Sequence, residues 1–434
     1  MRLINVHTLQ LDEFFGSQIP EYQYAILSHT WEEEEVTFQE MQSLTDKPVV
    51  RNKRGFSKIE LTCDQAKKDG LDWAWVDTCC IDKSSSAELS EAINSMYTWY
   101  AKSTACYAYL VDAEANHDPE VQGLNFRGSR WFTRGWTLQE LIAPSTVNFF
   151  GKSWEFLGTR DTLQADIRAV TGIPWNVLLI SSPLEKFSVA QKMSWASKRQ
   201  TTREEDVAYC MLGLLGIHMP LLYGEGSKAF LRLQEEIIKQ IDDQSLFAWA
   251  VDSKDPRAWS IGGLLANSPA DFADCSTIGS LTDEVGEPSV LTKKGLYIHA
   301  PILPLAFPDT SRLHSYGTGN AYTRRGMHPQ LFQLVLNCRS LDSFSSPVTI
   351  WIYRTDEWSI KDIDRRVFAR VMAPGIRQYW GERNADEFTE LTELTEDFKR
   401  IYLTMKTQPD QPFIGGGIHL HGIPLLFRHP LYDS

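Results

Sequence analysis

A single carboxylate, Glu140, interrupts an apolar stretch that runs from Ser129 to Phe150. The spacing of the apolar residues predicts one helix here, which Pro144 ends because proline cannot continue a helix, and then a strand. Trp136 comes four residues before Glu140, so both side chains share one helix face, opposite the apolar stripe. A lone glutamate beside a tryptophan is either a solvated surface charge or a site residue. In a site, its carboxylate would stabilise positive charge on a bound substrate.

Chemically active side chains also follow two of the expected strands. The apolar run 24–29 leads through a serine and a histidine to a threonine and a tryptophan, and the run 71–76 ends at an aspartate. Aromatic rings can stack on a base or a nicotinamide ring, and hydroxyl or carboxylate groups can bind ribose hydroxyls. We therefore take Glu140 as the candidate catalytic residue. The candidate substrate-binding residues are Ser28, His29, Thr30, Trp31, Asp77 and Trp136.

These residues come together if the first part of the chain alternates strands with helices. Short continuous apolar runs, typical of strands buried on both faces, are separated by helical patterns. The pattern predicts an α/β domain with a parallel sheet, whose carboxyl ends carry the ligand site. The expected strands are Tyr24–His29, Leu71–Val76, Ala105–Val111 and Thr146–Phe150, and the expected helices include Ser57–Asp69 and one that Ser85 and Glu88 begin as a capping box.

The pattern changes twice in the rest of the chain. Amphipathic helices dominate between residues 156 and 245, and beyond them short β-rich runs are separated by proline, glycine and serine clusters. The sequence therefore predicts three domains: an α/β domain over 1–155, an α-helical extension over 156–245 and a β-rich C-terminal domain over 246–434. The β-rich runs are Ser289–Leu291, Leu296–Ala300, Leu331–Leu336, Val348–Tyr353, Val367–Met372 and Ile401–Met405.

Composition disfavours several classes of function. The net charge of -13 over 434 residues argues against a nucleic-acid binder, because phosphate contacts need a surplus of lysine and arginine. The seven cysteines and ten histidines show no metal-binding spacing, so we expect no metal, and reduced thiols in the core. The N-terminus has no signal-peptide pattern, and the charge-free segment 207–224 is too short to be a membrane span. We therefore expect a cytoplasmic protein without a membrane span.

The common phosphate-binding and nucleophile motifs do not occur in the sequence. There is no Gly-x-Gly-x-x-Gly after the first strand, no P-loop and no Gly-x-Ser-x-Gly elbow, which disfavours Rossmann dehydrogenases, P-loop ATPases and serine hydrolases. A single carboxylate can still do chemistry when the leaving group departs as a neutral molecule. Cleavage of the nicotinamide–ribose bond of NAD is such a reaction, because it builds positive charge on the ribose that Glu140 would stabilise.

Four blocks of sequence resemble the fungal HET domain, the heterokaryon-incompatibility module of filamentous fungi. They are YAILSHTW at 24–31, WAWVDTCCID at 73–82, WYAKS at 99–103 and RGWTLQELIAP at 134–144. The stretch that begins MSWASKRQTTREEDVAYCMLGLLGI is similar to the extension that commonly follows HET domains. The resemblance implies a role in programmed cell death when genetically unlike hyphae fuse.

The HET domain is in turn similar to the TIR domain, and the order of motifs here agrees with that. A strand that ends in Ser-His, a strand that ends at Asp77 and the block around Glu140 follow one another as in TIR domains. Thr137 stands where TIR motifs often have cysteine, and Asp112 stands where many have serine. The resemblance implies a TIR-like, flavodoxin-like sheet. It also implies that Glu140 is catalytic, as the matching glutamate is in TIR domains that cleave NAD.

Three functions are compatible with this sequence. The first is an NAD glycohydrolase that uses Glu140, needs no cofactor because NAD is its substrate, and kills the cell by depleting NAD or by making a nucleotide signal. The second is a non-enzymatic signalling module that self-associates through its HET domain or recruits other incompatibility proteins. The third is a module that binds a nucleotide without cleaving it. We favour the enzyme.

Overall fold

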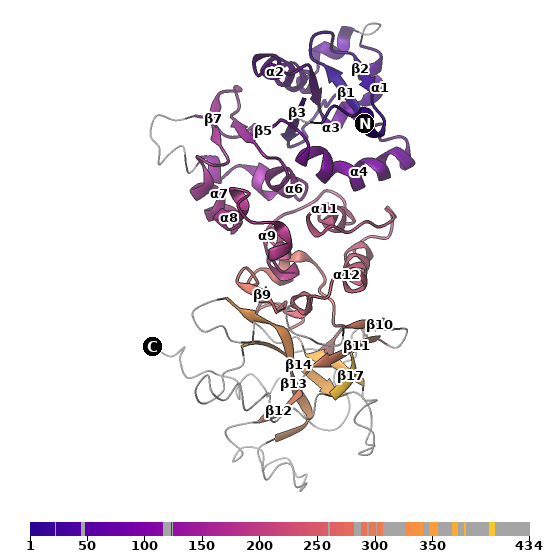
Figure 1. Ribbon diagram of the computed structural model, residues 1–434, viewed down its shortest axis with the longest axis vertical. Helices are drawn as coiled ribbons and strands as arrows, with labels where there is room; N and C mark the ends of the chain where they lie inside the picture. The colour runs from indigo at the N-terminus through magenta and orange to yellow at the C-terminus, as the bar shows by residue number, and fades with distance from the viewer. Residues whose placement is uncertain are drawn as a thin grey trace. The chain divides into compact units, whose positions relative to one another are not determined.

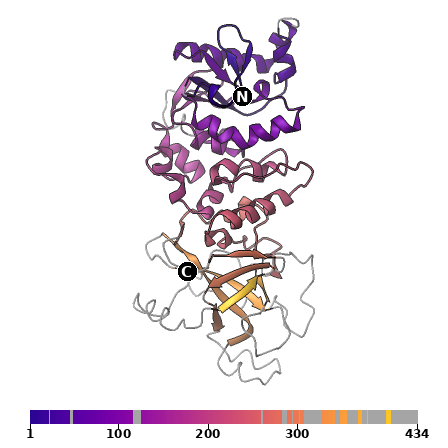
Figure 2. The ribbon, with the colours of Figure 1, turned by 45° about the vertical axis from the view of Figure 1, so that its right-hand side comes forward.

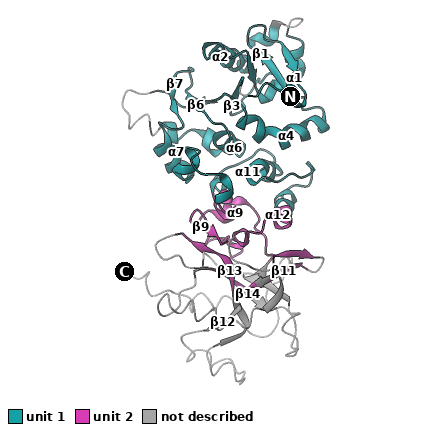
Figure 3. Cartoon of the chain, in the orientation of Figure 1, with its two compact units in different colours: residues 1–186, 195–233 teal, residues 187–194, 234–434 magenta. Residues whose placement is uncertain are grey.

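The computed structural model describes most of the first 281 residues and a set of strands beyond them. The described residues are 1–21, 23–44, 48–115, 123, 125–258, 261–281, 288–292, 295–300, 302–306, 327–341, 347–354, 367–371, 377–378 and 399–403. The chain forms two compact units, residues 1–186 with 195–233 (unit 1) and residues 187–194 with 234–434 (unit 2) (Figure 3). The domain boundaries expected after residues 155 and 245 stay a prediction.

Unit 1 is built around a seven-stranded sheet (Figure 1). Its strands are β1 (Arg2–Asn5), β2 (Leu11–Glu13), β3 (Tyr24–His29), β4 (Trp73–Trp75), β5 (Ala105–Tyr109), β6 (Val147–Phe150) and β7 (Phe156–Thr159). They lie in the order β2-β1-β4-β3-β5-β6-β7. All six residues of β3 and all five of β5 are buried, as continuous apolar runs predict for the centre of a covered sheet.

The sheet is mixed, so the expectation of a wholly parallel sheet is wrong at its edges. The four expected strands are confirmed as β3, β4, β5 and β6, and these pair in parallel. However, β1 pairs antiparallel with β4, and β7 pairs antiparallel with β6. The sequences of β1 (RLIN) and β2 (LDE) contain no continuous apolar run like those of the four expected strands, so the sequence pattern does not mark them as strands.

The order of the four parallel strands reverses between β3 and β5. Across the sheet they lie in the order β4-β3-β5-β6, so the strands that come second, first, third and fourth in the chain lie side by side in that order. In open α/β sheets, ligands bind at the carboxyl ends of the strands where the order reverses. Here Ser28 and His29, at the end of β3, lie in register with Ala108 and Tyr109 of β5. This topology places the end of β3 at the position where such a sheet binds ligands.

Two long helices, α2 (Arg54–Lys68) and α4 (Ser86–Ala101), lie on opposite sides of the sheet (Figures 1 and 2). The first packs against β3 and β4 and ends before Gly70, which has the left-handed φ of 77° that glycine adopts easily. The second begins at Ser85, whose side chain accepts a hydrogen bond from the backbone N–H of Glu88. Both helices are confirmed.

The expectation of one continuous helix over both tryptophans and Glu140 is wrong, because the helix is broken between Trp131 and Trp136, and Trp136 stands at the start of the helix that carries Glu140. The structure has a 3-10 turn, η3 (Arg130–Thr133), and a separate short helix, α6 (Thr137–Ile142), which ends before Pro144 as expected. Between them the backbone pairs with a distant segment: the N–H of Gly135 donates to the carbonyl oxygen of Gln200 at 2.9 Å. The helix is interrupted because these backbone groups are used in that pairing.

The remaining helices of unit 1 are short. The charge-free segment 207–224 contains all but the first residue of α10 and all of α11, and α11 ends at Gly216, which has a φ of 70°. Among the described residues, no helix has the length and apolar character needed to cross a membrane. The short elements are η1 (Gly16–Gln18), α1 (Phe38–Gln42), η2 (Pro48–Asn52), α3 (Asp77–Cys80), α7 (Gln164–Thr171), α8 (Trp175–Leu178), η4 (Leu184–Lys186), α10 (Asp206–Tyr209) and α11 (Leu212–Leu215).

Two further helices include residues of both units, α9 (Val189–Ala196) and α12 (Lys228–Gln240). Both lie between residues 156 and 245, where the sequence pattern predicts amphipathic helices. Two 3-10 turns follow in unit 2, η5 (Gln244–Phe247) and η6 (Pro269–Phe272).

The described strands of unit 2 form a ten-stranded sheet in which most pairs are antiparallel. Each of the six β-rich runs expected from the sequence overlaps a strand, whereas residues 404–434 of the expected C-terminal domain lie outside the described residues. The strands are β8 (Ile261–Gly262), β9 (Ile278–Ser280), β10 (Val290–Thr292), β11 (Gly295–Ala300), β12 (Ile302–Ala306), β13 (Met327–Ser340), β14 (Pro347–Arg354), β15 (Val367–Val371), β16 (Arg377–Gln378) and β17 (Lys399–Leu403).

Candidate functional site

Glu140 lies in a helix that is buried on all sides. Every residue of α6 is buried, and the side chain of Glu140 is not on a solvated face, since the residue is only 7% exposed. It meets the end of β3, where Ser28 is 0% exposed and its hydroxyl donates a hydrogen bond to Oε2 of Glu140. The structure therefore brings together the candidate catalytic residue and one candidate binding residue. It does so at the point where the strand order reverses.

Trp131, a residue outside the set predicted from the sequence, completes this contact. Its indole Nε1–H donates to Oγ of Ser28 at 2.9 Å, and the residue is 0% exposed. Because an indole N–H can only donate, the Ser28 hydroxyl accepts from Trp131 and directs its own proton to Glu140. The sequence could have indicated Trp131, because it is a second tryptophan five positions before Trp136 in the stretch Ser129–Phe150 that also carries Glu140.

Burial raises the pKa of Glu140 from an ordinary value of 4.5 to about 8. The hydrogen bond from Ser28 lowers this pKa, the charge of Asp77 raises it, and both Tyr100 and Arg199 lower it. The hydroxyl of Tyr100 donates to the backbone oxygen of Leu27 at 2.9 Å, beside Ser28. At neutral pH most of the Glu140 side chains hold a proton. We call Ser28, Tyr100, Trp131 and Glu140 the Glu140 cluster.

A second cluster lies on the other face of the sheet. Successive strand residues point to opposite faces, so His29 points away from Ser28. Nε2 of His29 lies 3.0 Å from Oδ1 of Asp77, and its Nδ1 lies 3.3 Å from Nζ of Lys58, which belongs to α2. The candidate residues at the end of β3 therefore do not converge on one point. We call His29, Trp31, Lys58, Asp77 and Lys83 the His29 cluster.

Asp77 is the centre of charge in the His29 cluster. Burial opposes its ionisation, but Lys83, His29 and the indole of Trp31 outweigh burial and hold the pKa of Asp77 well below its ordinary value. The Trp31 Nε1–H donates to Oδ2 of Asp77 at 2.9 Å, and Nζ of Lys83 lies 3.7 Å from the same oxygen. Asp77 also begins the short helix α3. Its charge reaches Glu140, which links the two clusters electrostatically.

Trp31 and Lys83 are the parts of the His29 cluster that face solvent. The side chain of Trp31 is 51% exposed, and Nζ of Lys83 lies 3.5 Å from the centroid of its ring. Such a cation–π contact holds the ring beside the charged groups. An exposed, fixed indole at the end of β3 is a surface on which a planar ring can stack.

The glutamate run after Trp31 is only partly the solvated loop that its composition suggests. Glu33 and Glu34 are exposed, but Glu35 is half-buried and pairs with the ammonium of Lys58, which is itself buried. The Lys58 ammonium also donates to the backbone oxygen of Thr30 at 3.2 Å. Thr30 is thus held through its main chain.

Trp136 lies outside both clusters. Its indole Nε1–H donates to Oδ2 of Asp206, a residue of α10, at a distance of 3.3 Å. The side chain of Asp206 is also bound by the hydroxyl of Tyr223 at 2.9 Å. Trp136 therefore connects the start of α6 to the helical segment that follows the sheet.

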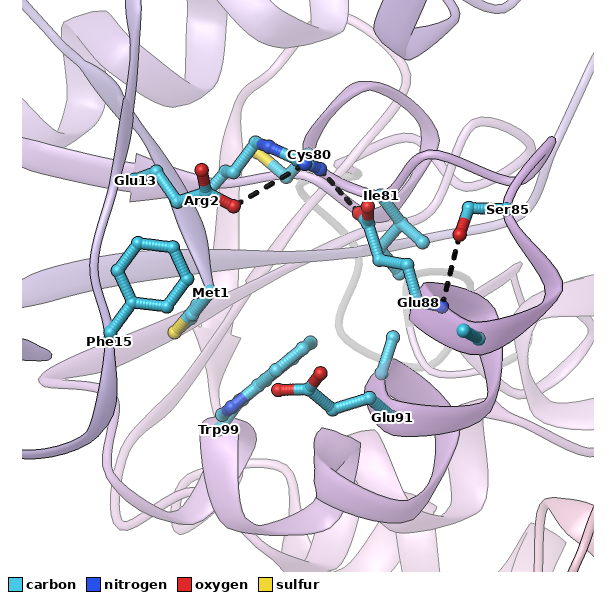
Figure 4. Close-up of a pocket in the computed structure, with 12 residues that line it drawn as sticks. Met1, Arg2, Glu13, Phe15, Cys80, Ile81, Ser85, Glu88, Glu91 and Trp99 are labelled. Atoms are coloured by element: carbon cyan, nitrogen blue, oxygen red, sulfur yellow. Dashed lines mark hydrogen bonds and ion pairs between the residues drawn. The ribbon is translucent and has the colours of Figure 1, made fainter.

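A pocket of about 280 Å³ lies elsewhere in unit 1, and none of the candidate site residues lines it (Figure 4). Its lining includes Arg2, three glutamates and Trp99. The guanidinium of Arg2 is already paired with Glu13, at 3.4 Å, and with Glu88. The three glutamates outnumber the arginine, so the lining residues together carry a net negative charge. Such a pocket is a poor site for a phosphate group.

The described residues contain no group of three histidine, cysteine, aspartate or glutamate side chains placed to hold a metal ion. All seven cysteines are buried, as expected for core thiols.

Comparison with known proteins agrees with the resemblance of the sequence motifs. Residues 24–127 match the family model described as heterokaryon incompatibility protein (HET), and residues 228–293 match a domain of unknown function (DUF8212). The vegetative incompatibility protein HET-E-1 of Podospora anserina is 48% identical in an alignment of 259 residues that covers 56% of this chain and 18% of that protein. The chain thus spans less than a fifth of the length of this relative. No solved structure matches the chain.

The matched residues contain the ends of β3 and β4, with Ser28, His29 and Asp77. Glu140 lies beyond residue 127, in the helix that the fold packs against β3. The family match, together with the identity to HET-E-1, shows that this chain contains a HET domain in the part that residues 24–127 cover.

Proposed function

We propose that this protein acts in heterokaryon incompatibility, as the name of its relative suggests, and that it kills by cleaving NAD at the nicotinamide–ribose bond. The reaction takes place in the cytoplasm, with NAD as substrate and Glu140 as the catalytic carboxylate. The observation that carries the proposal is the hydrogen bond from Ser28 to Glu140 at the end of β3. The strand order reverses beside this contact, and that is where sheets of this type bind ligands.

The chemistry asks for an ionised carboxylate next to the ribose. As the bond to nicotinamide breaks, the ribose gains positive charge, and a fixed negative charge stabilises it more than it stabilises the neutral bond. Ser28 donates to Glu140 and is held by Trp131, so the carboxylate keeps one orientation. Burial removes water from the carboxyl, which strengthens its interaction with a substrate cation.

The TIR-like interpretation of the fold supports the same assignment. The parallel strands have the order second, first, third, fourth, which is that of flavodoxin-like sheets. In this interpretation Trp31 stacks on a ring of the nucleotide with Asp77 beside it, and Ser28 lies with Glu140 near the ribose. Because Ser28 is 0% and Glu140 7% exposed, the substrate reaches them only when the surrounding chain moves. Self-association of the HET domain is the event that we propose opens the site.

The closed cluster also favours a second candidate function. A glutamate that burial keeps protonated, and that is bonded to a buried serine, can act purely as a packing group. In that case the protein is a signalling module that works by self-association or by recruiting other incompatibility proteins. Cell death would then not depend on the charge of Glu140.

Nicotinamide release by the purified full chain separates the two functions. We expect release from NAD at high protein concentration with a crowding agent, and no release by the Glu140→Gln variant, which keeps the shape of the side chain. Glu33→Gln is the control, because Glu33 lies exposed on the loop after β3, and it should match the wild type. If the wild type releases nothing at any concentration, and Glu140→Gln still kills in a fungal host, the signalling module is correct.

A further inference from the structure

The start of α6 is held by a segment that lies about 65 residues later in the chain. The backbone N–H of Gln200 donates to the carbonyl oxygen of Thr133 at 2.6 Å, and the N–H of Gly135 donates to the oxygen of Gln200 at 2.9 Å. These bonds form a parallel bridge between Arg134 and Gln200. Both stretches belong to unit 1. Residues 199–206, which we call the clamp segment, therefore fix the backbone just before the helix of Glu140.

Gly135 permits the close approach of the clamp segment. A Cβ atom at this position would lie 2.6 Å from Cγ2 of Thr201 and 3.1 Å from Sγ of Cys210. Both distances are shorter than ordinary contacts between carbon or sulfur and a side chain. Any larger residue at position 135 must push the clamp segment away from α6.

Arg199 extends from the clamp segment into the start of α6. One nitrogen of its guanidinium, Nη1, donates to the carbonyl oxygen of Arg134 and to Oγ1 of Thr137, each at 2.8 Å. The Thr137 hydroxyl donates in turn to the carbonyl oxygen of Trp131 at 2.6 Å. Arg199 is thus connected through one side chain to the residue that orients Ser28. Its other terminal nitrogen, Nη2, is buried and has no hydrogen-bond partner among the described residues.

The charge of Arg199 acts on the Glu140 cluster as well. Burial lowers the pKa of Arg199 to about 10, so the guanidinium keeps its positive charge at neutral pH. The groups that interact electrostatically with Glu140 from the surrounding elements are Asp77 of α3, Tyr100 of α4, Cys106 of β5 and Arg199. Of these four, only Arg199 carries positive charge. A buried arginine with an unused donor is suited to meet a carboxylate that becomes ionised.

We propose that Arg199 is a positioning residue for Glu140, and that the clamp segment is part of the site although it lies beyond the matched HET residues. Arg199 holds the first turn of α6 through Thr137 and supplies the positive charge that favours the ionised form of Glu140. The inference rests on the proposed function for its catalytic meaning. Its structural part is independent of any reaction. A piece of the chain that ended at residue 127 or 186 would lack this residue.

The test compares Arg199→Gln, which removes the charge, with Arg199→Lys, which retains it, both in the full chain. For each background, the free energy of unfolding is measured with and without Glu140→Gln across the pH range, and the pH dependence of the difference gives the midpoint of Glu140 titration. We expect Arg199→Gln to move this midpoint to higher pH and Arg199→Lys to move it less. Arg203→Gln is the matched control, because Arg203 lies in the same segment but its guanidinium packs over the ring of Tyr223 at 4.5 Å.

An unchanged midpoint in Arg199→Gln, or an equal shift in Arg203→Gln, would overturn the proposal. If Arg199→Gln does not fold, Gly135→Ala provides a second route, since its Cβ displaces the clamp segment. The midpoint must then rise, and adding Thr201→Ser, which removes Cγ2, must bring it back toward the wild-type value. Where the wild type cleaves NAD, the acid limb of its pH–rate profile must move with the midpoint. If it does not cleave NAD, the proposed function fails, while the midpoint still decides the role of Arg199.

Discussion

Replacing Glu140 with glutamine should make the protein more stable at high pH than the wild type. The folded state holds the Glu140 proton up to a pKa of about 8, whereas the ordinary value is 4.5. The difference, 8 - 4.5 = 3.5, corresponds to about 5 kcal/mol at about 1.4 kcal/mol per pKa unit. Glutamine keeps the size of the side chain and can still accept the Ser28 hydrogen bond, but it has no proton to lose.

The direction of the effect follows from the protons bound in each state. Between pH 4.5 and about 8, the folded wild type binds a proton at Glu140 that the unfolded chain has released. The stability that Glu140 contributes is therefore fully present below pH 4.5 and is lost as the pH rises through about 8. The difference in stability between Glu140→Gln and the wild type should be small at the acid end. It should grow steadily and level off above the pKa of Glu140.

Urea unfolding curves of both proteins, measured at a series of pH values, give this difference directly. Most other titrating groups cancel, because both proteins contain them. Glu33→Gln removes an exposed carboxyl of the same type and should follow the wild type at every pH. A difference between Glu140→Gln and the wild type that stays flat across this range would refute the burial of an uncompensated carboxyl at this position.

Three further perturbations test the surroundings of Glu140. Trp131→Phe removes the donor to Ser28 and part of a fully buried ring, and should lower the free energy of unfolding by about 2 kcal/mol in urea titrations. Asp77→Asn removes a charge that raises the pKa of Glu140, so the Glu140 midpoint should move to lower pH, opposite to the shift in Arg199→Gln. Under the proposed function, nicotinamide release should increase as the pH rises through about 8, where half of Glu140 is ionised, and should level off at higher pH; a rate that falls as the pH rises through this value contradicts it.

The centre of the fold was predictable because its residues satisfy local rules. Strand β3 coincides with the expected strand, since a run of buried apolar residues ends there in small polar ones. Helix α4 was marked by Ser85, a side chain that caps the first turn. The edges of the sheet were not predictable. Strands β1 and β2 pair with each other, and β1 pairs with β4, but their own sequences contain no continuous apolar run that marks them as strands.

The site was partly predictable for a similar reason. Ser28 and Glu140 could be assigned to one site from the sequence, because the order of strands and helices along the chain determines which strand ends and helices lie at the same edge of the sheet. The alternation of faces along β3 is a property of any strand, so it separates His29 from Ser28 on the sequence pattern alone. The interruption of the Glu140 helix at Gly135 could not be seen, because its cause, Gln200, lies far away in the sequence. Long-range backbone pairing of this kind has no local signal.

The chain passes between its two units at three places, after residues 186, 194 and 233. Each unit is therefore made of two separate stretches of the gene. Recombination between two alleles at a single breakpoint therefore cannot replace one entire unit and leave the other entirely from the original allele. Of these breakpoints, one after residue 186 would separate Glu140 from the arginine that accompanies it, whereas one after residue 233 would transfer both together. In a protein family whose members are compared between strains, variation should accordingly be inherited in blocks that keep residues 134–142 and 199–206 on the same parental copy.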